Sequence, residues 1–577
     1  MSTDPIGSFA LVLHSHLPYV LLHGRSPHGT DWLTEAASET YLPLLDALYG
    51  LVDSGCSPKI TIGITPVLAE QLADPTFVYE FQTYLQAKID AASVDEEAFT
   101  AQELPRQAEL AAWWREHYQK TLGRFRRRYG KSIIGAFKEL QDAGHIEIMT
   151  SGATHGYSPL LCQDTSIQAQ VKQGVRTYKR HFGKDPRGYW LPECAYRPRY
   201  VWSYPAYPPG SEPIPYLRKG VEEFLGENGL KYFIVESHLL RGGQAGGVYA
   251  DRFAALKNLW SQFQDQYLIE DSEKTQYTPY WVNTQGKAAE PVAVFARDPE
   301  TGGQVWSAAS GYPGDEWYLE FHKKHVPGNH RYWRISGANV DLGDKLDYEP
   351  QKAAERTRAH AEHFVWMVKD TLRKHLERCG TPGVICAPYD TELFGHWWFE
   401  GVDWLTEAIR LMSADPEIQL TTCGDYLEAN PPNQVVSLPE GSWGEGGFHW
   451  IWFNQQTYWS WELVYDAELC MRRLAQEYGK RDDTARVLAQ AARELLLLQS
   501  SDWQFNISSN TSVDYGHARI KEHYGSFKRL EAMVGDVASG RTVTEEDWDF
   551  LAYCEERDPL FPDIDPNWYA GLEVPAE

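Results

Sequence analysis

The sequence has little positive charge for its size and few of the cysteine patterns that carry metal or redox chemistry. Its 577 residues include 54 Lys and Arg against 80 Asp and Glu, for a formal net charge of −26. Binding to DNA or RNA needs a basic face that releases counterions, so no nucleic-acid partner is expected. Eight cysteines are present, and no two of them have the C-x-x-C spacing. Zinc-ribbon and thioredoxin-like sites are therefore excluded, and reduced thiols are expected rather than a disulfide framework.

Long hydrophobic runs are also missing. No uninterrupted apolar stretch of about 20 residues is available to span a bilayer, so no membrane partner is expected. The N-terminal sequence MSTDPIGSFALVLHSHLPY has no basic segment before its short apolar run, and it does not predict a signal peptide. These features favour a cytoplasmic protein.

Aromatic residues, by contrast, are abundant. They make up 13% of the chain and include 22 Trp and 33 Tyr. A large hydrophobic core would account for many of them. Several Trp lie in polar, Gly-rich segments, however, which favours a second use as flat apolar surfaces for sugar rings.

Short apolar segments alternate with helical patterns along most of the chain. This alternation predicts parallel β/α architecture. Strands are expected at residues 9–13, 59–66, 146–149, 188–192, 231–235, 292–295 and 383–387.

Two carboxylates come directly after predicted strands. Glu193 lies in WLPECAY and Asp390 in APYDTELFGHWW. The carboxyl ends of barrel strands carry catalytic groups, and two such carboxylates suffice to cleave a glycosidic bond. Glu193 has two other interpretations, a metal ligand or a buried ion pair. Glu392 competes for the second catalytic role, although a turn is expected between it and Asp390.

A cluster of histidines is expected at the same edge of the barrel. His14 and His16 are two residues apart on a strand and share one face, and His155 follows another strand in SGATHGY. These side chains would line an active site, ligate a metal as in barrel hydrolases, or be hydrogen-bonded within the core.

Taken in order, HSHLPY, SGATHGY, WLPECAY and YDTELFGHWWFEG resemble the signature segments of glycoside hydrolase family 57. SWGEGGFHWIWFN and SSDWQF are similar to the helical C-terminal domain of the family's 1,4-α-glucan branching enzymes. The resemblance covers nearly the whole chain. It implies an incomplete (β/α)7 barrel acting on α-glucan by a retaining double displacement, with neither cofactor nor metal.

The expected domains follow from this reading. Residues 1–80 and 146–437 are predicted to form the catalytic barrel. Residues 81–145, which are charged and helix-forming, are predicted to be a helical insertion. Residues 438–577 are predicted to form a helical C-terminal domain. A monomer or a homodimer is expected.

The resemblance also implies roles for individual residues. Glu193 corresponds to the nucleophile and Asp390 to the acid/base, so their carboxyl groups are expected about 5–6 Å apart. His14, His16 and His155 match histidines of the donor subsite. Further substrate-binding positions carried over from the branching enzymes are Trp32, Arg297, Trp306, Gly314, Trp443, Trp452 and Asp502, although each Trp has an alternative reading as hydrophobic packing between the domains.

The loop after the strand at 231–235 departs from the resemblance, and residues 237–291 look longer than the family's spacing. In branching enzymes this loop carries a Tyr that shields the covalent intermediate from water. Here the tip reads RGGQAGG, and the nearest tyrosine is Tyr249. Four glycines within six residues make ordering this loop entropically costly, so appreciable hydrolysis is expected beside branching unless Tyr249 supplies the cover.

Three alternatives remain open. An α-amylase or a 4-α-glucanotransferase on the same scaffold would share the catalytic pair. A metal-dependent barrel hydrolase would use His14 and His16. A glycogen-binding protein with a decayed site would lack one of the two carboxylates, yet both are present.

Overall fold

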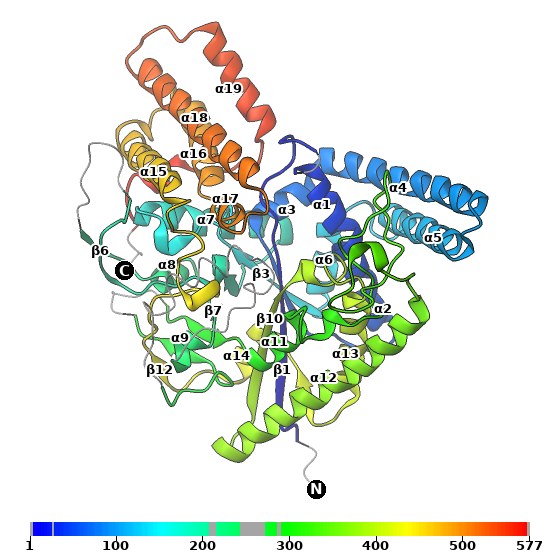
Figure 1. The fold of residues 1–577 in the computed structure, drawn as a ribbon. Helices are drawn as coiled ribbons and strands as arrows, with labels where there is room; N and C mark the ends of the chain where they lie inside the picture. Colours follow the sequence, from blue (N-terminus) through cyan, green and yellow to red (C-terminus); the bar gives the residue numbers. More distant parts are fainter. Residues whose placement is uncertain (1–3, 26–27, 207–214, 243–271, 285–289, 574–577) are drawn as a thin grey trace.

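The computed structural model describes residues 4–25, 28–206, 215–242, 272–284 and 290–573 (Figure 1). Tyr249 lies outside these ranges. Each of the seven predicted strands is found, and all seven run parallel in the order β10-β1-β2-β3-β4-β7-β9. Their bounds are β1 (Gly7–Ser15), β2 (Ile60–Ile64), β3 (Ile146–Ser151), β4 (Gly188–Trp190), β7 (Tyr232–Val235), β9 (Ala293–Ala296) and β10 (Gly383–Asp390).

The two ends of this sheet meet at a short seam. Arg297, just after β9, forms a parallel bridge with Cys386 of β10, and the backbone N–H of Asp298 donates to the Cys386 carbonyl at 2.9 Å. By contrast, β1 and β10 pair over eight residues. The sheet is therefore a barrel that is barely closed, and the predicted incomplete (β/α)7 barrel is confirmed.

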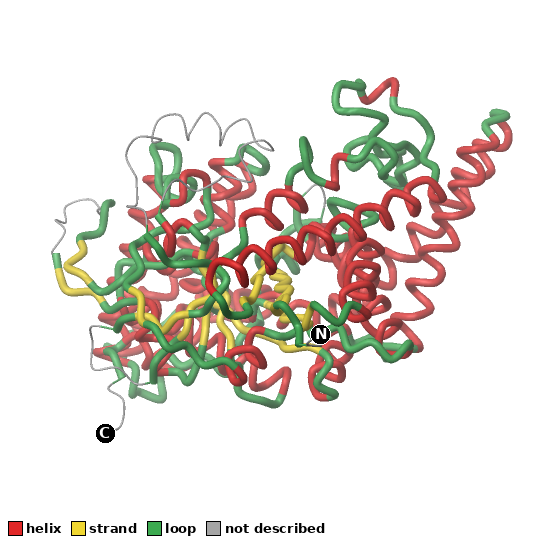
Figure 2. Tube along the Cα trace, turned by 90° about the horizontal axis from the view of Figure 1, so that it is seen from below, coloured by secondary structure: helices red, strands yellow, loops and turns green. Residues whose placement is uncertain are grey.

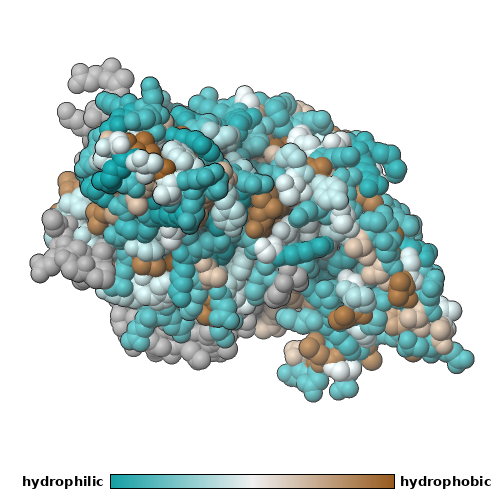
Figure 3. All heavy atoms as spheres, turned by 90° about the horizontal axis from the view of Figure 1, so that it is seen from above, coloured by the Kyte–Doolittle hydropathy of each residue, from teal (hydrophilic) through white to brown (hydrophobic). Residues whose placement is uncertain are grey.

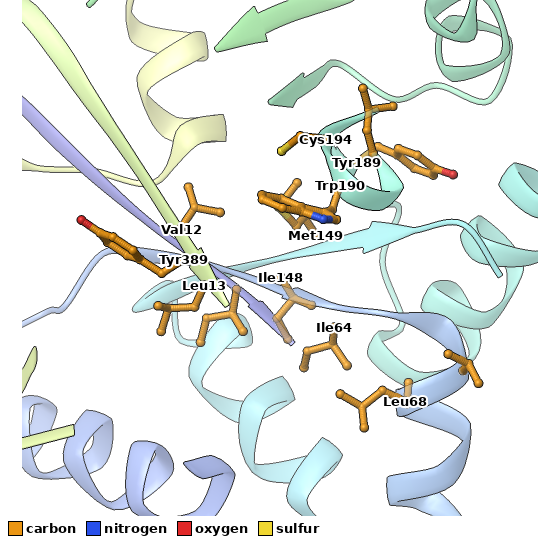
Figure 4. Packing of buried hydrophobic residues seen from close by; sticks show 14 of the residues in the cluster. Val12, Leu13, Ile64, Leu68, Ile148, Met149, Tyr189, Trp190, Cys194 and Tyr389 are labelled. Carbon is orange, nitrogen blue, oxygen red and sulfur yellow. The ribbon is translucent and has the colours of Figure 1, made fainter. Parts of the chain in front are cut away.

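Buried side chains fill the barrel because its strands are apolar on both faces. β1 and β2 are buried at every position, as expected for parallel strands covered by helices. Figure 4 shows side chains of β1, β2, β3, β4 and β10 packed together, among them Val12, Ile64, Met149, Trp190 and Tyr389. Figure 2 shows most of the strands in the interior with helices around them.

Helices connect most of the strands. The 30-residue α12 ends at Gly380, whose φ of 72° lies in the left-handed region that favours glycine. The helices between strands are α1 (Thr30–Ala36), α2 (Leu42–Asp53), α3 (Pro66–Ala73), α6 (Ile133–Asp142), α7 (Asp164–Phe182), α8 (Val221–Glu227), α9 (His238–Arg241), α11 (Pro299–Trp306), α12 (Pro350–Cys379), α13 (Gly401–Ala414) and α14 (Cys423–Ala429). The remaining strands are β5 (Tyr200–Trp202), β6 (Tyr216–Arg218), β8 (Tyr280–Val282), β11 (Ile418–Leu420) and β12 (Val435–Val436).

Two long helices project beside the barrel, the first beginning six residues before the predicted insertion at 81–145. α4 (Pro75–Ala101) and α5 (Pro105–Arg127) lie side by side (Figure 1). They hold a distant loop, because Lys88 donates to the Gly328 carbonyl at 2.7 Å and the Trp114 indole donates to the Arg331 carbonyl at 2.7 Å. The helical hairpin therefore fixes the loop that precedes α12.

The end of the chain is helical, with α15 (Tyr458–Tyr478), α16 (Ala485–Leu498), α17 (Asp502–Ser508), α18 (Val513–Ala538) and α19 (Glu545–Arg557). Buried ion pairs tie this region to the loop after β1. His23 lies between Asp558, at 2.6 Å, and Glu522, at 3.2 Å, and Arg557 pairs with Asp558 at 2.7 Å. The predicted boundaries at residues 80, 145 and 437 stay predictions.

None of the helices in the described part of the chain combines the length and the apolar character that a membrane crossing requires. The face drawn in Figure 3 is mostly hydrophilic, with hydrophobic residues in small separate groups.

Candidate active site

A cavity of about 540 Å³ opens at the carboxyl ends of the barrel strands. Barrel loops form one part of its wall, and the C-terminal helical region forms the other. The lining residues are His14, His16, Leu17, His28, Trp32, Ala36, His155, Glu193, Phe321, His322, Asp390, Glu392, His396, Trp397, Trp443, Asp502, Phe505, Asn506, Thr511 and Ser512.

Glu193 stands on a strained turn directly after β4. Its φ of 61° and ψ of 26° are left-handed, and the next residue, Cys194, has a φ of 49°. Non-glycine residues adopt this conformation rarely, and such strain concentrates at functional sites. The Trp443 backbone N–H donates to the Glu193 carbonyl at 3.1 Å and helps to hold the turn. The backbone therefore presents the carboxylate to the cavity at an energetic cost.

Two donors hold the Glu193 carboxylate, one on each oxygen. The Trp443 indole N–H lies 2.8 Å from Oε2, and the Ser501 hydroxyl lies 3.2 Å from Oε1. Burial raises the pKa of Glu193 to about 8, and the negative charges of Asp390 and Asp502 act in the same direction. The hydrogen bonds from Trp443 and Ser501 oppose this rise because they stabilise the ionised form.

Asp390 is the last residue of β10 and lies opposite His14 in the strand register. Its charge acts on Glu193, so the two carboxylates share one electrostatic environment. A 3-10 turn begins at the next residue, as expected, and it separates Glu392 from the strand. The Glu392 carboxylate accepts hydrogen bonds from the Tyr41 hydroxyl and, at 3.3 Å, from the His16 backbone N–H. Burial raises the pKa of Glu392 to about 8.

The predicted histidine cluster is present and stacked. His16 and His155 have ring centroids 4.0 Å apart, and His14 and His155 have centroids 5.1 Å apart. His16 Nε2 lies 2.9 Å from Oδ2 of Asp502. Burial opposes ionisation of Asp502, but the charge of His16 and its hydrogen bond outweigh it and lower the Asp502 pKa to about 2. Burial lowers the pKa of His14 and of His155 well below the ordinary value, and the charge of His16 lowers both further.

A chain of hydrogen bonds leads from the histidines to Glu193. His14 Nε2 lies 3.1 Å from His155 Nε2, and His155 Nδ1 lies 2.9 Å from the Ser501 hydroxyl. The hydroxyl has a single proton, so when it donates to Glu193, His155 must donate to it from Nδ1. His155 Nε2 is then an acceptor, and His14 must be its donor. This arrangement fixes the tautomers of two neutral histidines.

Three of these side chains come close enough to be considered as metal ligands. One ligand atom from each of His16, His155 and Asp502 lies within 4.8 Å of the others. However, the two rings are stacked with only 21° between their planes, so their nitrogen lone pairs run side by side rather than toward one point. A tetrahedral zinc site needs converging ligands, and the observed arrangement fits a hydrogen-bonded cluster better.

Eight of the predicted site residues line the cavity: His14, His16, Trp32, His155, Glu193, Asp390, Trp443 and Asp502. Four others in the described part of the chain are not among its lining residues: Arg297, Trp306, Gly314 and Trp452. Arg297 is buried, with its guanidinium 3.2 Å from Glu236 and 6.0 Å from the centre of the Trp443 ring. Trp306 is buried and contacts the ring of Trp397, which does line the cavity.

Gly314 and Trp452 have packing roles that the structure makes visible. A Cβ on Gly314 would lie 2.0 Å from the Ala308 carbonyl oxygen, so the close approach of these two segments requires glycine. Trp452 is 1% exposed and stacks on Tyr157 with centroids 4.4 Å apart. A substrate-binding role for these two residues, and for Arg297, Trp306 and Tyr249, stays a prediction.

Several lining residues were not predicted from the sequence. His396 and Trp397 lie within the motif that contains Asp390, and their place in this motif could have identified them as site residues. Phe321 and His322 come from the loop held by α4 and α5, and no local pattern marks them. The remaining lining residues are Leu17, His28, Ala36, Phe505, Asn506, Thr511 and Ser512, to which Ser501 is added by its hydrogen bond to Glu193. Of these, Leu17 lies in the HSHLPY motif, and Phe505 and Ser501 lie in the SSDWQF motif.

A β/α barrel with two carboxylates at its strand ends, inside a cavity lined with aromatic residues, has the architecture of an enzyme that cleaves glycosidic bonds. Residues 10–439 match the model of glycosyl hydrolase family 57. Residues 463–569 match the model of the C-terminal region of 1,4-alpha-glucan branching enzymes. The chain belongs to glycosyl hydrolase family 57.

Individual relatives are similar to this chain over nearly its whole length. The chain is 43% identical over 571 residues to the 1,4-alpha-glucan branching enzyme of Thermococcus kodakarensis, and the match covers 99% of this chain and 79% of that protein. The crystal structure of that enzyme in complex with glucose has a TM-score of 0.87 at 42% identity, covering 99% of this chain and 98% of the other. The branching enzyme of Pyrococcus horikoshii has a TM-score of 0.86 at 39% identity, with the same coverage. The α-amylase AmyC of Thermotoga maritima has a TM-score of 0.79 at 30% identity, covering 98% and 100% of the two chains.

Proposed function

We propose that the protein is a 1,4-α-glucan branching enzyme that works by retaining double displacement. Glu193 attacks C1 of an α-1,4-linked glucosyl unit while Asp390 protonates the departing oxygen, which leaves a covalent glucosyl–Glu193 ester. Asp390 then takes the proton of an acceptor 6-hydroxyl, whose oxygen attacks C1 and releases Glu193. The product is an α-1,6 branch with the original anomeric configuration.

The observation that carries this proposal is the environment of Glu193. Its carboxylate is buried, strained on a left-handed turn and held by one donor on each oxygen. One of these donors, Ser501, belongs to the region that matches the branching-enzyme C-terminal model. The C-terminal helices therefore take part in forming the proposed nucleophile's site.

The protonation required by the mechanism fits a pair of carboxyl groups that shares one proton. Burial and the charge of Asp390 make it costly for both groups to ionise together near neutral pH. The donors from Trp443 and Ser501 stabilise the charge when it resides on Glu193. In that state the shared proton is on Asp390, where the leaving oxygen needs it.

Branching also requires a bound acceptor to compete with water. Aromatic side chains from both parts of the cavity wall, including Trp32, Phe321, Trp397 and Phe505, supply flat surfaces for glucose rings. We propose α-glucan, including glycogen-like chains, as donor and acceptor, and the cytoplasm as location. A monomer or homodimer without cofactor or metal is proposed.

An α-amylase activity is the second candidate. The similarity to the Thermotoga maritima α-amylase extends over almost the whole chain, so the scaffold is shared with a hydrolase. The match of residues 463–569 to the branching-enzyme C-terminal model favours transfer over hydrolysis.

Proton NMR of amylose after incubation with the enzyme distinguishes the two candidates. A branching enzyme converts α-1,4 anomeric signals into α-1,6 signals with few new reducing ends. The Glu193→Gln variant is the control and should change neither signal. New reducing ends without α-1,6 signals would contradict the proposed function and support the amylase.

A further inference from the structure

A second cavity, of about 260 Å³, lies beside the C-terminal end of α12 and shares no residue with the catalytic cavity. Its wall carries three cations, Arg241, Lys374 and Arg378, and one carboxylate, Glu300. This excess of positive charge is unusual in a chain whose net charge is −26. The protein as a whole repels anions because its net charge is negative, but a cavity lined by cations attracts them locally.

The floor of this cavity is polar and buried. His375 is 2% exposed, and in the described part of the chain neither of its ring nitrogens has a hydrogen-bond partner. Gln276 and Thr371 are 5% and 4% exposed beside it. Buried polar groups are nearly always hydrogen-bonded, so a lining histidine whose buried nitrogens lack partners among the described residues leaves hydrogen-bonding capacity unused at the wall of this cavity.

The position of His375 is fixed by its neighbours. Its ring meets the Tyr277 ring edge-on at 5.4 Å. A Cβ on Gly383, at the start of β10, would lie only 2.6 Å from the His375 ring, so glycine leaves the room that the ring occupies. Burial, and then the charge of Arg378, lower the pKa of His375. An anion in the cavity would offset both effects and favour the protonated, donating imidazolium.

The cations have donors to spare for such an anion. A guanidinium has five N–H groups, and among the described residues Arg378 makes one weak hydrogen bond, at 3.4 Å, to Thr275. Lys374 pairs with Asp370 at 2.6 Å, but both side chains are exposed, so the pair is screened and weak. Arginine and lysine together are the usual partners of phosphate oxygens.

The geometry points to a small phosphate-bearing ligand, and we propose that this cavity binds a phosphomonoester of about hexose size. The volume equals that of about nine water molecules, which is more than inorganic phosphate fills and less than a drug-sized ligand needs. A neutral sugar would leave the cations unpaired, and the cavity offers it one aromatic ring, Tyr277, whose hydroxyl already donates to Asp298 at 2.9 Å.

Calorimetric titration with a hexose phosphate, at fixed ionic strength, tests the proposal. We expect one saturable site in the wild type and binding at least about tenfold weaker in Arg378→Gln, since the substitution removes charge-assisted hydrogen bonds to the phosphate. The matched control is Lys120→Gln, which removes an exposed cation on α5 and should leave the affinity unchanged. His375→Asn, which removes the buried partner, should weaken binding without removing a positive charge from the rim.

Two outcomes would overturn the proposal. No saturable binding in the wild type, or equal affinity in the wild type and Arg378→Gln, would show that the cavity holds no phosphate ligand. Loss of binding in Glu193→Gln, which alters only the catalytic cavity, would assign the ligand to that cavity instead. Inorganic phosphate, titrated as a second probe, should bind at the same site more weakly because it lacks the sugar.

Discussion

Replacing Glu193 by Gln should make the protein more stable, and the gain should grow with pH. The ordinary pKa of a glutamate is 4.5, whereas burial raises that of Glu193 to about 8 in the folded protein. Between these two values the folded protein holds a proton that the unfolded chain releases. The free energy of unfolding of the wild type therefore falls as pH rises from about 4.5 to about 8. A glutamine does not titrate, so the variant lacks this fall.

The size of the effect follows from the same shift. Each pKa unit corresponds to about 1.4 kcal/mol, so the full difference sets an upper limit of about 5 kcal/mol above pH 8. Glutamine is a weaker acceptor for the Trp443 indole than a carboxylate, which costs about 1–2 kcal/mol. We therefore expect a net gain of about 2–4 kcal/mol at pH 8.5. For a chain of this length, an unfolding entropy of about 2.1 cal/mol/K per residue converts this gain into a rise in Tm of about 2–3 °C.

Differential scanning calorimetry at pH 5 and at pH 8.5 measures the effect, since the difference in Tm should be small at pH 5 and positive at pH 8.5. Glu109→Gln is the control, because this glutamate is two-thirds exposed on α5 and should show no pH-dependent gain. A Glu193→Gln variant that is less stable than the wild type at pH 8.5, or a difference that does not change with pH, would refute the reasoning.

Four further predictions concern activity. Asp390→Asn should lower the rate of branching of amylose by at least about 10³-fold, while circular dichroism should show that the fold is retained. A smaller loss of activity would show that Asp390 is not one of the catalytic pair. Ser501→Ala should lower kcat at an unchanged KM and move the acidic limb of the pH–rate profile to higher pH, because it removes a donor that favours ionised Glu193. Ser501→Thr should restore the profile. Ser508→Ala, which removes a hydroxyl at the end of α17 that donates to the Ile451 carbonyl, should not move it. Treatment with EDTA should leave activity intact, and a loss reversed by zinc would revive the metal interpretation of His16. Tyr249→Ala should raise the ratio of hydrolysis to transfer with initial bond cleavage unchanged, and an unchanged ratio would leave Tyr249 no shielding role.

The barrel was predictable because its signal is local. Each strand is a short apolar run between helical segments. Because a parallel strand is buried on both faces, such a run is sufficient to identify it from the sequence. The same rule placed His14, Glu193 and Asp390 at one edge, since parallel strands in a barrel all end on the same side. The carboxyl separation of this pair stays a prediction.

The rest of the cavity depends on contacts between distant segments. Phe321 reaches the cavity because its loop is anchored to Lys88 and Trp114, more than 200 residues earlier in the chain. Ser501 lies in the SSDWQF segment beside Asp502, but the motif does not indicate that this serine donates to Glu193. Its hydrogen bond to Glu193 exists only once the C-terminal helices have docked on the barrel, and no local pattern encodes that docking.

The origin of the Glu193 donors has a consequence for protein synthesis. A ribosome that has just added Asp390 has made both carboxylates, yet Ser501 follows 111 residues later, the difference between the two residue numbers. At about 5–20 residues per second, this stretch takes about 6–22 s to translate. Trp443 is added after 53 of these residues, the difference between 443 and 390. The nascent chain therefore lacks the Ser501 hydroxyl throughout the interval, and during about its first half it also lacks the Trp443 indole. A chain that stalls or is cleaved before the last helices therefore lacks a donor to the proposed nucleophile, and we expect it to cleave α-glucan poorly.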